Sequence, residues 1–176
     1  SGNIAYNLNK PYNYVEYSLF HHLGSTTVRF ILVGILELVI GLLYLKSFPS
    51  LTFFQIIGIL LTCLLATIIN ILLIISIGLI SFFIEDANPF YWVYSKLILV
   101  IGTIFPIEFF PKLLQPIIKF SPIYVVSYGP AKLFVDFHIQ TLIQILLFQS
   151  IYLLLAFIIA HAIYKKGVRK LNVNGG

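Results

Sequence analysis

The feature that most restricts the fold is a run without a single charged side chain, from residue 53 to residue 83. At a rise of about 1.5 Å per residue, a helix of this length is roughly 46 Å long, whereas the hydrocarbon core of a bilayer is about 30 Å thick. Two spans would need about forty residues, so the run predicts one long helix that is tilted or projects from the bilayer. Asn70, near its middle, is expected to make an interhelical hydrogen bond.

The composition agrees with a membrane protein. Hydrophobic residues make up 60% of the chain and charged residues 10%, and the mean hydropathy is +1.01. We therefore predict an all-α, polytopic integral membrane protein, because only runs this apolar supply spanning helices. The single cysteine, Cys63, excludes a disulfide framework. The expected spans are residues 26–45, 53–83, 91–105 and 139–164.

The stretch from residue 106 to residue 132 cannot be an ordinary span. It contains five of the eight prolines, and each proline removes a backbone donor and clashes with the preceding turn of a helix. The stretch is also too apolar for an aqueous loop. Lipid tolerates irregular backbone only where it packs against protein or lines a cavity. We therefore expect residues 106–138 to form a broken, partly immersed segment, around which function should be sought.

The span predicted at residues 91–105 supports this interpretation. It amounts to only about 22 Å of helix, so it needs the proline-rich segment to complete a crossing. Aromatic residues at its start and Lys96 one turn later are typical of a membrane interface. Glu85 and Asp86 lie in the preceding turn on the cytoplasmic side. We interpret them as a solvated turn that ends a helix, with cation coordination as the less favoured alternative.

A carboxylate lies inside the first expected span. Glu37 shares a helix face with Gly34 and Gly41, a small-residue pattern that lets helices approach closely in lipid. A charge at this depth costs about 2.5–3.5 kcal/mol on insertion scales, so Glu37 should face protein or water. Two interpretations stay open, a functional site and a polar group that joins two helices.

Residues 1–25 are polar and rich in tyrosine. Val15, Leu19 and Leu23 recur at the spacing of one helix face, and tyrosine is favoured where one side of a ring is buried and its hydroxyl is wet. The pattern indicates an amphipathic cytoplasmic segment. It is equally compatible with a plain juxtamembrane linker and with a docking element.

The distribution of basic residues predicts the orientation. Four spans put both termini on one side, which then carries seven of the eleven basic residues, and the positive-inside rule places that side in the cytoplasm. The basic cluster in residues 165–176 is interpreted as a topology anchor in preference to a nucleic-acid contact. The proline-rich segment then lies outside. The sequence contains no Walker-type phosphate loop, so ATP binding of that kind is excluded.

Three stretches carry a resemblance to a known family: SGNIAYNLNKP at 1–11, FFIEDANPFYW at 82–92 and FPIEFFPKLLQPIIKFSPIYVVSYGPAKLF at 105–134. With the order of the spans, they resemble the ABC-2 type permeases, the membrane subunits of ATP-driven exporters, and in particular their six-helix branch. The similarity covers essentially the whole chain. The family has six helices and this chain shows four, so either the first two precede residue 1 or the chain is a truncated product.

The resemblance implies partners and site residues. Two cytoplasmic ATPase subunits would pair with two permease halves, as a homodimer or a heterodimer, in the cell membrane. The segment before the first span would dock on the ATPase, and its candidate coupling residues are Tyr6, Lys10, Pro11 and Tyr14. The proline-broken segment would form an external gate, and its candidate residues are Pro106, Glu108, Pro111 and Lys112.

Enzyme chemistry is not expected of this chain. His21 and His22 are about 100° apart on a helix, and His138 and His161 bracket the last span, so the four histidines do not converge on a metal. No nucleophile can be paired with a base either. We therefore expect no catalytic residue, metal or cofactor, with ATP hydrolysis in a separate subunit. The alternatives are a non-transporting membrane scaffold or assembly subunit, and a membrane-embedded enzyme acting on lipid.

Overall fold

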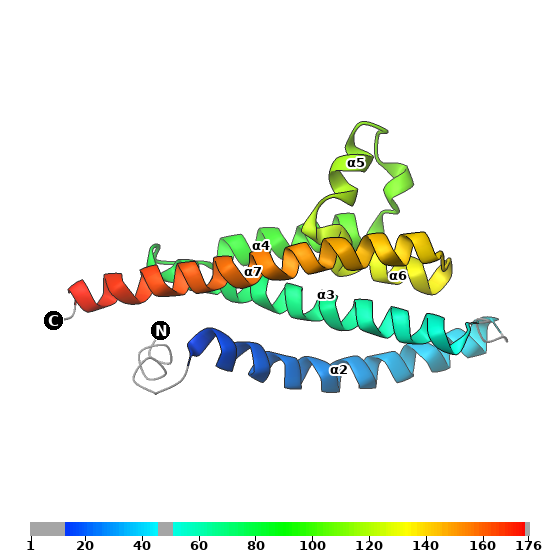
Figure 1. The fold of residues 1–176 in the computed structure, drawn as a ribbon, viewed down its shortest axis with the longest axis horizontal. Helices are drawn as coiled ribbons and strands as arrows, with labels where there is room; N and C mark the ends of the chain where they lie inside the picture. Colours follow the sequence, from blue (N-terminus) through cyan, green and yellow to red (C-terminus); the bar gives the residue numbers. More distant parts are fainter. Residues whose placement is uncertain (1–12, 46–50, 175–176) are drawn as a thin grey trace.

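The computed structural model describes residues 13–45 and 51–174, and every regular element in these ranges is a helix. Three long helices dominate: α2 (Tyr14–Leu45), α3 (Phe53–Leu79) and α7 (Ile139–Asn174). They run side by side with α3 between the other two (Figure 1). Each is long and apolar enough to cross a membrane, and no other helix in the described ranges is. The predicted all-helical membrane architecture is confirmed, with three such helices where the sequence predicted four spans.

α3 starts at a capping box. The Gln55 N–H donates to the Thr52 hydroxyl at 3.4 Å, and the Thr52 N–H donates to the Gln55 side chain at 2.8 Å. This arrangement satisfies two donors that the start of a helix leaves free. At its other end, α3 continues into a 3₁₀ turn, η1 (Ile80–Phe82), so nearly the whole charge-free run is one helical stretch.

α2 runs without a break through position 26, where the sequence suggested a boundary between a juxtamembrane segment and a span. No proline interrupts it, and the Thr27 hydroxyl donates to the Leu23 carbonyl one turn back, which satisfies it within the helix. Only the first turns of α2 are well packed. Val15 is fully buried, and Leu19 and Leu23 pack against the same cluster. None of the most apolar stretch of α2 is buried.

The predicted span at 91–105 corresponds to α4 (Asn88–Leu97) followed by a π-helical segment, η2 (Ile98–Ile104). Pro89 lies in the first turn of α4, where its missing N–H removes no intrahelical hydrogen bond. Together α4 and η2 are shorter than the roughly 18 residues that mark a spanning helix. Of the four predicted spans, this is therefore the one that is too short to cross a membrane alone.

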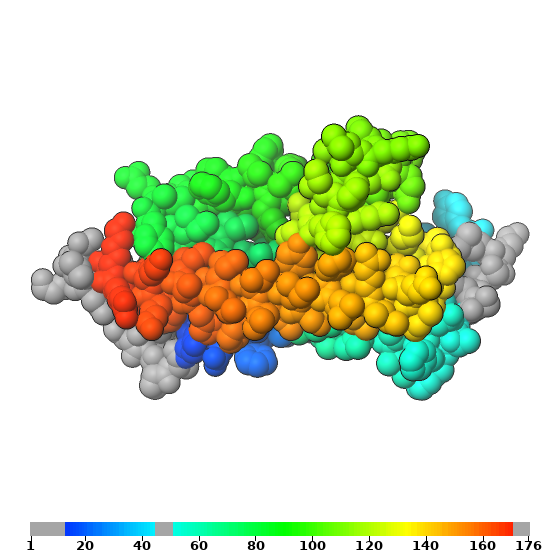
Figure 2. Space-filling model, turned by 45° about the horizontal axis from the view of Figure 1, so that its top comes forward, coloured from blue at the N-terminus to red at the C-terminus, as the bar shows by residue number. Residues whose placement is uncertain are grey.

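Between η2 and α7 the chain forms two different structures. Residues 106–121, here called the excursion, stand out sideways from the long helices (Figures 1 and 2) and contain η3 (Ile107–Phe109) and α5 (Leu114–Lys119). Residues 122–135, here called the proline helix, lie back against the bundle. The proline helix includes π-helical η4 (Tyr124–Tyr128) and α6 (Gly129–Val135).

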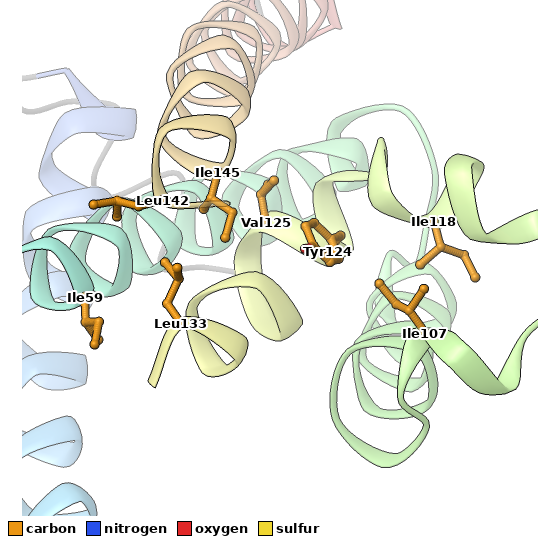
Figure 3. Packing of buried hydrophobic residues seen from close by; sticks show 8 residues of the cluster. All are labelled: Ile59, Ile107, Ile118, Tyr124, Val125, Leu133, Leu142 and Ile145. Carbon is orange, nitrogen blue, oxygen red and sulfur yellow. The ribbon is translucent and has the colours of Figure 1, made fainter. Parts of the chain in front are cut away.

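Two hydrophobic clusters hold these elements together. One joins α3, α7, the proline helix and the excursion (Figure 3); in the excursion Ile107 and Ile118 lie near each other, and Val125 lies beside Ile145 of α7. The other joins the first turn of α2 to the later halves of α3 and α7. Its buried members are Val15, Ile71, Leu72, Ile75, Leu79, Ala156 and Ala160.

The basic cluster after the last predicted span is part of α7. Gly167 is buried against the ring of Phe82, and an added Cβ at Gly167 would lie 2.6 Å from the Phe82 Cγ. The Lys170 Nζ lies 5.5 Å from the centroid of the Phe83 ring, within the range of a cation–π interaction. The end of α7 therefore packs on the turn that follows α3.

Candidate functional site

The proline helix contains a proline in its interior, Pro130. Because proline has no backbone N–H, the carbonyl five residues earlier, that of Val125, cannot receive a π-helical hydrogen bond. The N–H of Gly129, which would supply the α-helical bond, donates to the Tyr124 carbonyl instead. Val125 is fully buried, so its carbonyl needs a donor from another element.

Gln149 of α7 supplies this donor. Its side chain is fully buried, and its Nε2 donates two hydrogen bonds of 2.9 Å each, to the carbonyls of Val125 and of Thr62 in α3. One amide therefore joins α7, α3 and the proline helix. The Oε1 of Gln149 is buried and has no hydrogen-bond partner within the described residues. The sequence had given Gln149 no role.

Two glycines let the proline helix approach its neighbours closely. Gly102 of η2 lies against Ser127, and a Cβ added at Gly102 would overlap the Ser127 Oγ and lie 2.9 Å from its Cβ. A Cβ added at Gly129 would lie 3.2 Å from the Cδ1 of Ile145. The π-helical segments η2 and η4 are thus in direct contact. π-helical turns occur frequently at functional sites.

Glu108 of the excursion is the centre of a polar cluster. The Tyr128 hydroxyl donates to Glu108 Oε2 at 3.1 Å, and the Lys132 Nζ lies 3.6 Å from Oε1. Both partners belong to the proline helix, so the cluster joins the excursion to it. The pKa of Glu108 is lowered, chiefly by a hydrogen bond from its own backbone N–H and further by Tyr128 and Lys132, while partial burial opposes the shift. The carboxylate is therefore ionised at neutral pH.

The other candidate gate residues lie in the excursion outside this cluster. Pro106 caps the start of η3, and the carbonyl of Pro111 accepts a hydrogen bond from the Leu114 N–H at 2.8 Å. Lys112 is exposed, and within the described residues the ion pair of Glu108 is made by Lys132 instead. The sequence had selected neither Lys132 nor Tyr128.

The base of the excursion is also tied to α7. The Tyr152 hydroxyl donates to the Phe120 carbonyl, and the Phe120 ring meets Phe148 edge to face with centroids 5.1 Å apart. Aromatic pairs prefer this geometry because the ring edge is positive and the face negative. The excursion is therefore fixed at its base, while Phe109 and Leu113 nearer its tip are 76% and 83% exposed.

The two polar residues predicted inside spans have different surroundings. Asn70 accepts a hydrogen bond of 2.8 Å from the Tyr94 hydroxyl of α4, so the expected interhelical bond is present. Glu37 is exposed on α2 and has no hydrogen bond or ion pair within the described residues. An added Cβ at Gly34 or Gly41 would meet no atom within 4 Å. The small-residue face around Glu37 is therefore open in this chain.

The start of α2 meets the end of α7. The rings of Tyr14 and Tyr164 stack with centroids 6.0 Å apart. The Asn13 Nδ2 lies 3.1 Å from the His161 Nε2, and the Asn13 Oδ1 accepts a hydrogen bond from the Val15 N–H, which caps the helix. The sequence had not paired Asn13 with His161. Three of the four candidate coupling residues lie outside the described residues: Tyr6, Lys10 and Pro11.

The acidic turn before α4 is exposed at both Glu85 and Asp86. Asp86 Oδ1 accepts a hydrogen bond of 2.9 Å from the Asn88 N–H, which shapes the turn into α4. His138 pairs with Asp136 at 3.1 Å in an exposed loop. In the ranges that the structure describes, no group of three or more His, Cys, Asp or Glu side chains is placed to hold a metal ion.

A profile of the family described as ABC-2 family transporter protein matches residues 1–175. The chain belongs to the ABC-2 transporter family. The resemblance carried by the three quoted stretches is thereby confirmed over essentially the whole chain. Comparisons with curated proteins and with solved structures gave no match.

Membership of the ABC-2 family identifies the chain as a permease-type membrane component of a transporter. In this ABC-2 chain, Gln149 makes a fully buried polar contact between the proline helix and the bundle. The cluster around Glu108 joins the excursion to the proline helix, and the contact between Asn13 and His161 joins the start of α2 to α7.

Proposed function

We propose that this chain is the permease subunit of an ABC-2 exporter that is driven by a separate cytoplasmic ATPase. The observation that carries the proposal is the family match over residues 1–175, and the membrane-length helices support it. The chain itself forms and breaks no covalent bonds in this scheme. ATP hydrolysis belongs to the partner, and movement of helices belongs to the permease.

The proposed topology has four crossings. α2, α3 and α7 each cross alone, and the fourth crossing is made by α4 and η2 together with the proline helix. Contact between η2 and η4 supports this division, because it links the short stretch of α4 and η2 to the proline helix. The excursion joins the two halves of this crossing, so we assign it to the outer, partly immersed part of the crossing, where it would shape an external gate around Glu108.

Both ends of the described chain are assigned to the cytoplasmic side of the cell membrane. The stacked Tyr14 and Tyr164 bring the start of α2 and the end of α7 together. Four basic residues lie at this end of α7, which favours a cytoplasmic location by the positive-inside rule. They are Lys165, Lys166, Arg169 and Lys170.

The same end offers a route for mechanical coupling. In the proposal, the ATPase docks on residues 1–25 and moves the start of α2 when it binds ATP. Val15 is buried in the cluster that also contains Ala156 and Ala160 of α7. A shift of α2 would therefore move α7, and α7 carries Gln149 beneath the proline helix. Motion at the cytoplasmic end would in this way reach the external segment.

The open face of α2 is assigned to contact with another helix of the transporter complex. A carboxylate in lipid costs about 2.5–3.5 kcal/mol on insertion scales, so Glu37 favours a partner that offers a hydrogen-bond donor. Gly34 and Gly41 leave room for such a helix to approach. The second permease half is the proposed source of this contact.

The proposal is tested by co-purification and reconstitution of the full-length protein. We expect it to bring down an ABC ATPase, the product of a neighbouring gene being the first to try, and to stimulate ATP hydrolysis in liposomes. A variant of the ATPase that cannot hydrolyse ATP is the control. If no ATPase co-purifies and no hydrolysis is stimulated, the exporter proposal is wrong. A stable complex that moves none of a panel of drugs, lipids and peptides would instead favour the scaffold alternative.

A further inference from the structure

We infer that Gln149 is the residue that positions the proline helix, because it supplies from α7 the hydrogen-bond donor that Pro130 takes away from Val125. The inference concerns how the external segment is seated on the bundle. Its consequence for transport rests on the proposed function, whereas the seating itself does not. No part of the sequence pattern or of the family match assigns a role to Gln149.

The first step is the need for a donor at this place. Pro130 cannot donate to the Val125 carbonyl, and the Gly129 N–H is already used by Tyr124. Val125, Thr62 and Gln149 are each fully buried, so bulk water does not reach the carbonyl. A buried carbonyl without a donor is strongly disfavoured, and most of all in a membrane. The proline helix can therefore keep its place only while an outside group donates to it.

The second step is the choice of side chain. Gln149 uses both hydrogens of its Nε2 on backbone carbonyls, one in the proline helix and one in α3. Its Oε1 has no partner in the described ranges. The amide therefore serves here as a hydrogen-bond donor only. A leucine would fill a similar volume but leave the Val125 carbonyl without a donor, whereas the Thr62 carbonyl lies inside the α-helix α3 and keeps its intrahelical hydrogen bond. Gln140 and Gln144, on the same helix, are exposed.

The third step is the position of this contact within the packing. The proline helix rests on Gly102 through Ser127 and on Ile145 through Gly129; a Cβ added at Gly102 would overlap Ser127, and one at Gly129 would require its neighbours to shift slightly. The amide of Gln149 lies in the same layer, beside the π-helical segment η4. Displacement of α7 relative to α3 must therefore either carry the proline helix with it or break the bond to Val125. If the chain works as proposed, Gln149 transmits the motion of α7 to the external segment.

The test is a double-mutant cycle between Gln149 and Pro130. The reporter is a cysteine at Val125, introduced as Val125→Cys in a Cys63→Ala background, and its reaction with a membrane-impermeant maleimide is followed in intact membranes. The proline helix must lift from the bundle before the reagent reaches this position, since Val125 is fully buried. Gln149→Leu should raise the labelling rate about tenfold or more, as expected for loss of a buried donor. Gln144→Leu, on an exposed face of α7, is the matched control and should leave the rate unchanged.

Pro130→Ala restores a backbone N–H that can donate to the Val125 carbonyl. In a Pro130→Ala background, Gln149→Leu should therefore have a clearly smaller effect than in the parent. Equal effects in both backgrounds, or an unchanged rate in Gln149→Leu alone, would overturn the inference. If Gln149→Leu does not accumulate in the membrane, protein abundance is compared across the same four variants. Recovery by Pro130→Ala then supports the inference, and no recovery overturns it.

The labelling assay needs neither an ATPase nor a cargo. Failure to find transport would therefore count against the proposed function and leave the positioning role of Gln149 to be decided by the cycle alone.

Discussion

α2 and the proline helix both lie against α3, but they differ in how much of each is buried. α2 is 32 residues long and free of proline, yet none of its most apolar stretch is buried in this chain. The proline helix contains Pro122 and Pro130 and a π-helical turn, yet Val125 and Leu133 are completely buried. Of these two helices, the longer and more regular one is thus the less buried within the chain.

The difference lies in what fills the space next to the glycines. Gly34 and Gly41 of α2 face no atom, whereas Gly102 and Gly129 are each met closely by a side chain of another element. Hydropathy shows where a helix can reside, and small residues show where another helix can approach. Neither property says whether the approaching helix is in the same chain. The glycines beside and within the proline helix are covered by this chain, whereas the face of α2 that carries Gly34 and Gly41 is uncovered in it.

The largest expected effect comes from adding one methyl group to a glycine in each region. Gly102→Ala should destabilise the protein by about 1–3 kcal/mol, because the new Cβ overlaps Ser127 and overpacking costs that much. Gly34→Ala should stabilise the isolated chain by up to about 1 kcal/mol, because alanine favours a helix over glycine and nothing lies in its way. The measurement is the denaturant-induced unfolding of the two variants in the same detergent.

A second-site change separates the clash at Gly102 from a change in helix propensity. Ser127→Gly removes the Oγ and Cβ of Ser127 with which the new Cβ would clash, so Gly102→Ala should cost much less in a Ser127→Gly background than in the parent. Destabilisation of similar size at Gly34 and Gly102 would contradict the contrast between the two regions. If Gly34→Ala stabilises the isolated chain but weakens its assembly with a partner, the open face of α2 is in use.

The sequence predicted the broad architecture because that depends on local properties. The charge-free run around Asn70 is long enough to specify one helix, and the spacing of Val15, Leu19 and Leu23 marked the face of α2 that packs. The prolines marked where regular helix is interrupted, but they did not separate the excursion, which holds three of them, from the proline helix, which packs on the bundle. Each of these features can be read from neighbours in the chain, without knowledge of the fold.

The polar contacts of the site could not be predicted in this way. The role of Gln149 depends on a carbonyl 24 residues away that is free only because of Pro130 and the π-helical turn. Lys132 reaches Glu108 only after the excursion has folded back, although Lys112 is much nearer in sequence. A glutamine in an apolar helix together with a proline inside a short helix was the available signal. The glutamine indicated a buried donor and the proline indicated a carbonyl without one, but nothing in the sequence showed that the two meet.

A smaller effect is expected at Asn13, which precedes α2 and contacts His161 of α7. Asn13→Ala removes the cap on the Val15 N–H and the contact with His161, and it should cost about 1 kcal/mol. Asn13→Ser keeps a capping oxygen but loses the amide donor, so it should cost less. Unfolding in detergent measures both. If Asn13→Ser is nearly as stable as the parent, the cap accounts for most of the stabilisation. Equal losses of stability in Asn13→Ala and Asn13→Ser would show that the contact with α7 accounts for it.

The smallest effect is expected at the ion pair between the excursion and the proline helix. The pKa of Glu108 is lowered in the folded protein, first by its own backbone N–H and then by Tyr128 and Lys132. Its stabilising contribution is therefore fully present above the ordinary carboxyl pKa of about 4.3, and it is lost as the pH falls through the lowered value. Because the pair is exposed and screened by salt, the contribution should be no more than about 1 kcal/mol.

Thermal unfolding in nanodiscs, followed from neutral pH down to about pH 3, measures this contribution against the ordinary carboxyl pKa. The parent protein should be slightly more stable than Glu108→Gln at neutral pH, and the two curves should converge in acid because both side chains are then uncharged. In a Lys132→Met background, the difference in stability between Glu108 and Gln at position 108 should be smaller at neutral pH. A gap that stays constant with pH would mean that shape, and not charge, holds the excursion to the proline helix. The contacts that seat that helix would then be the hydrogen bonds of Gln149 and the apolar packing against α3 and α7.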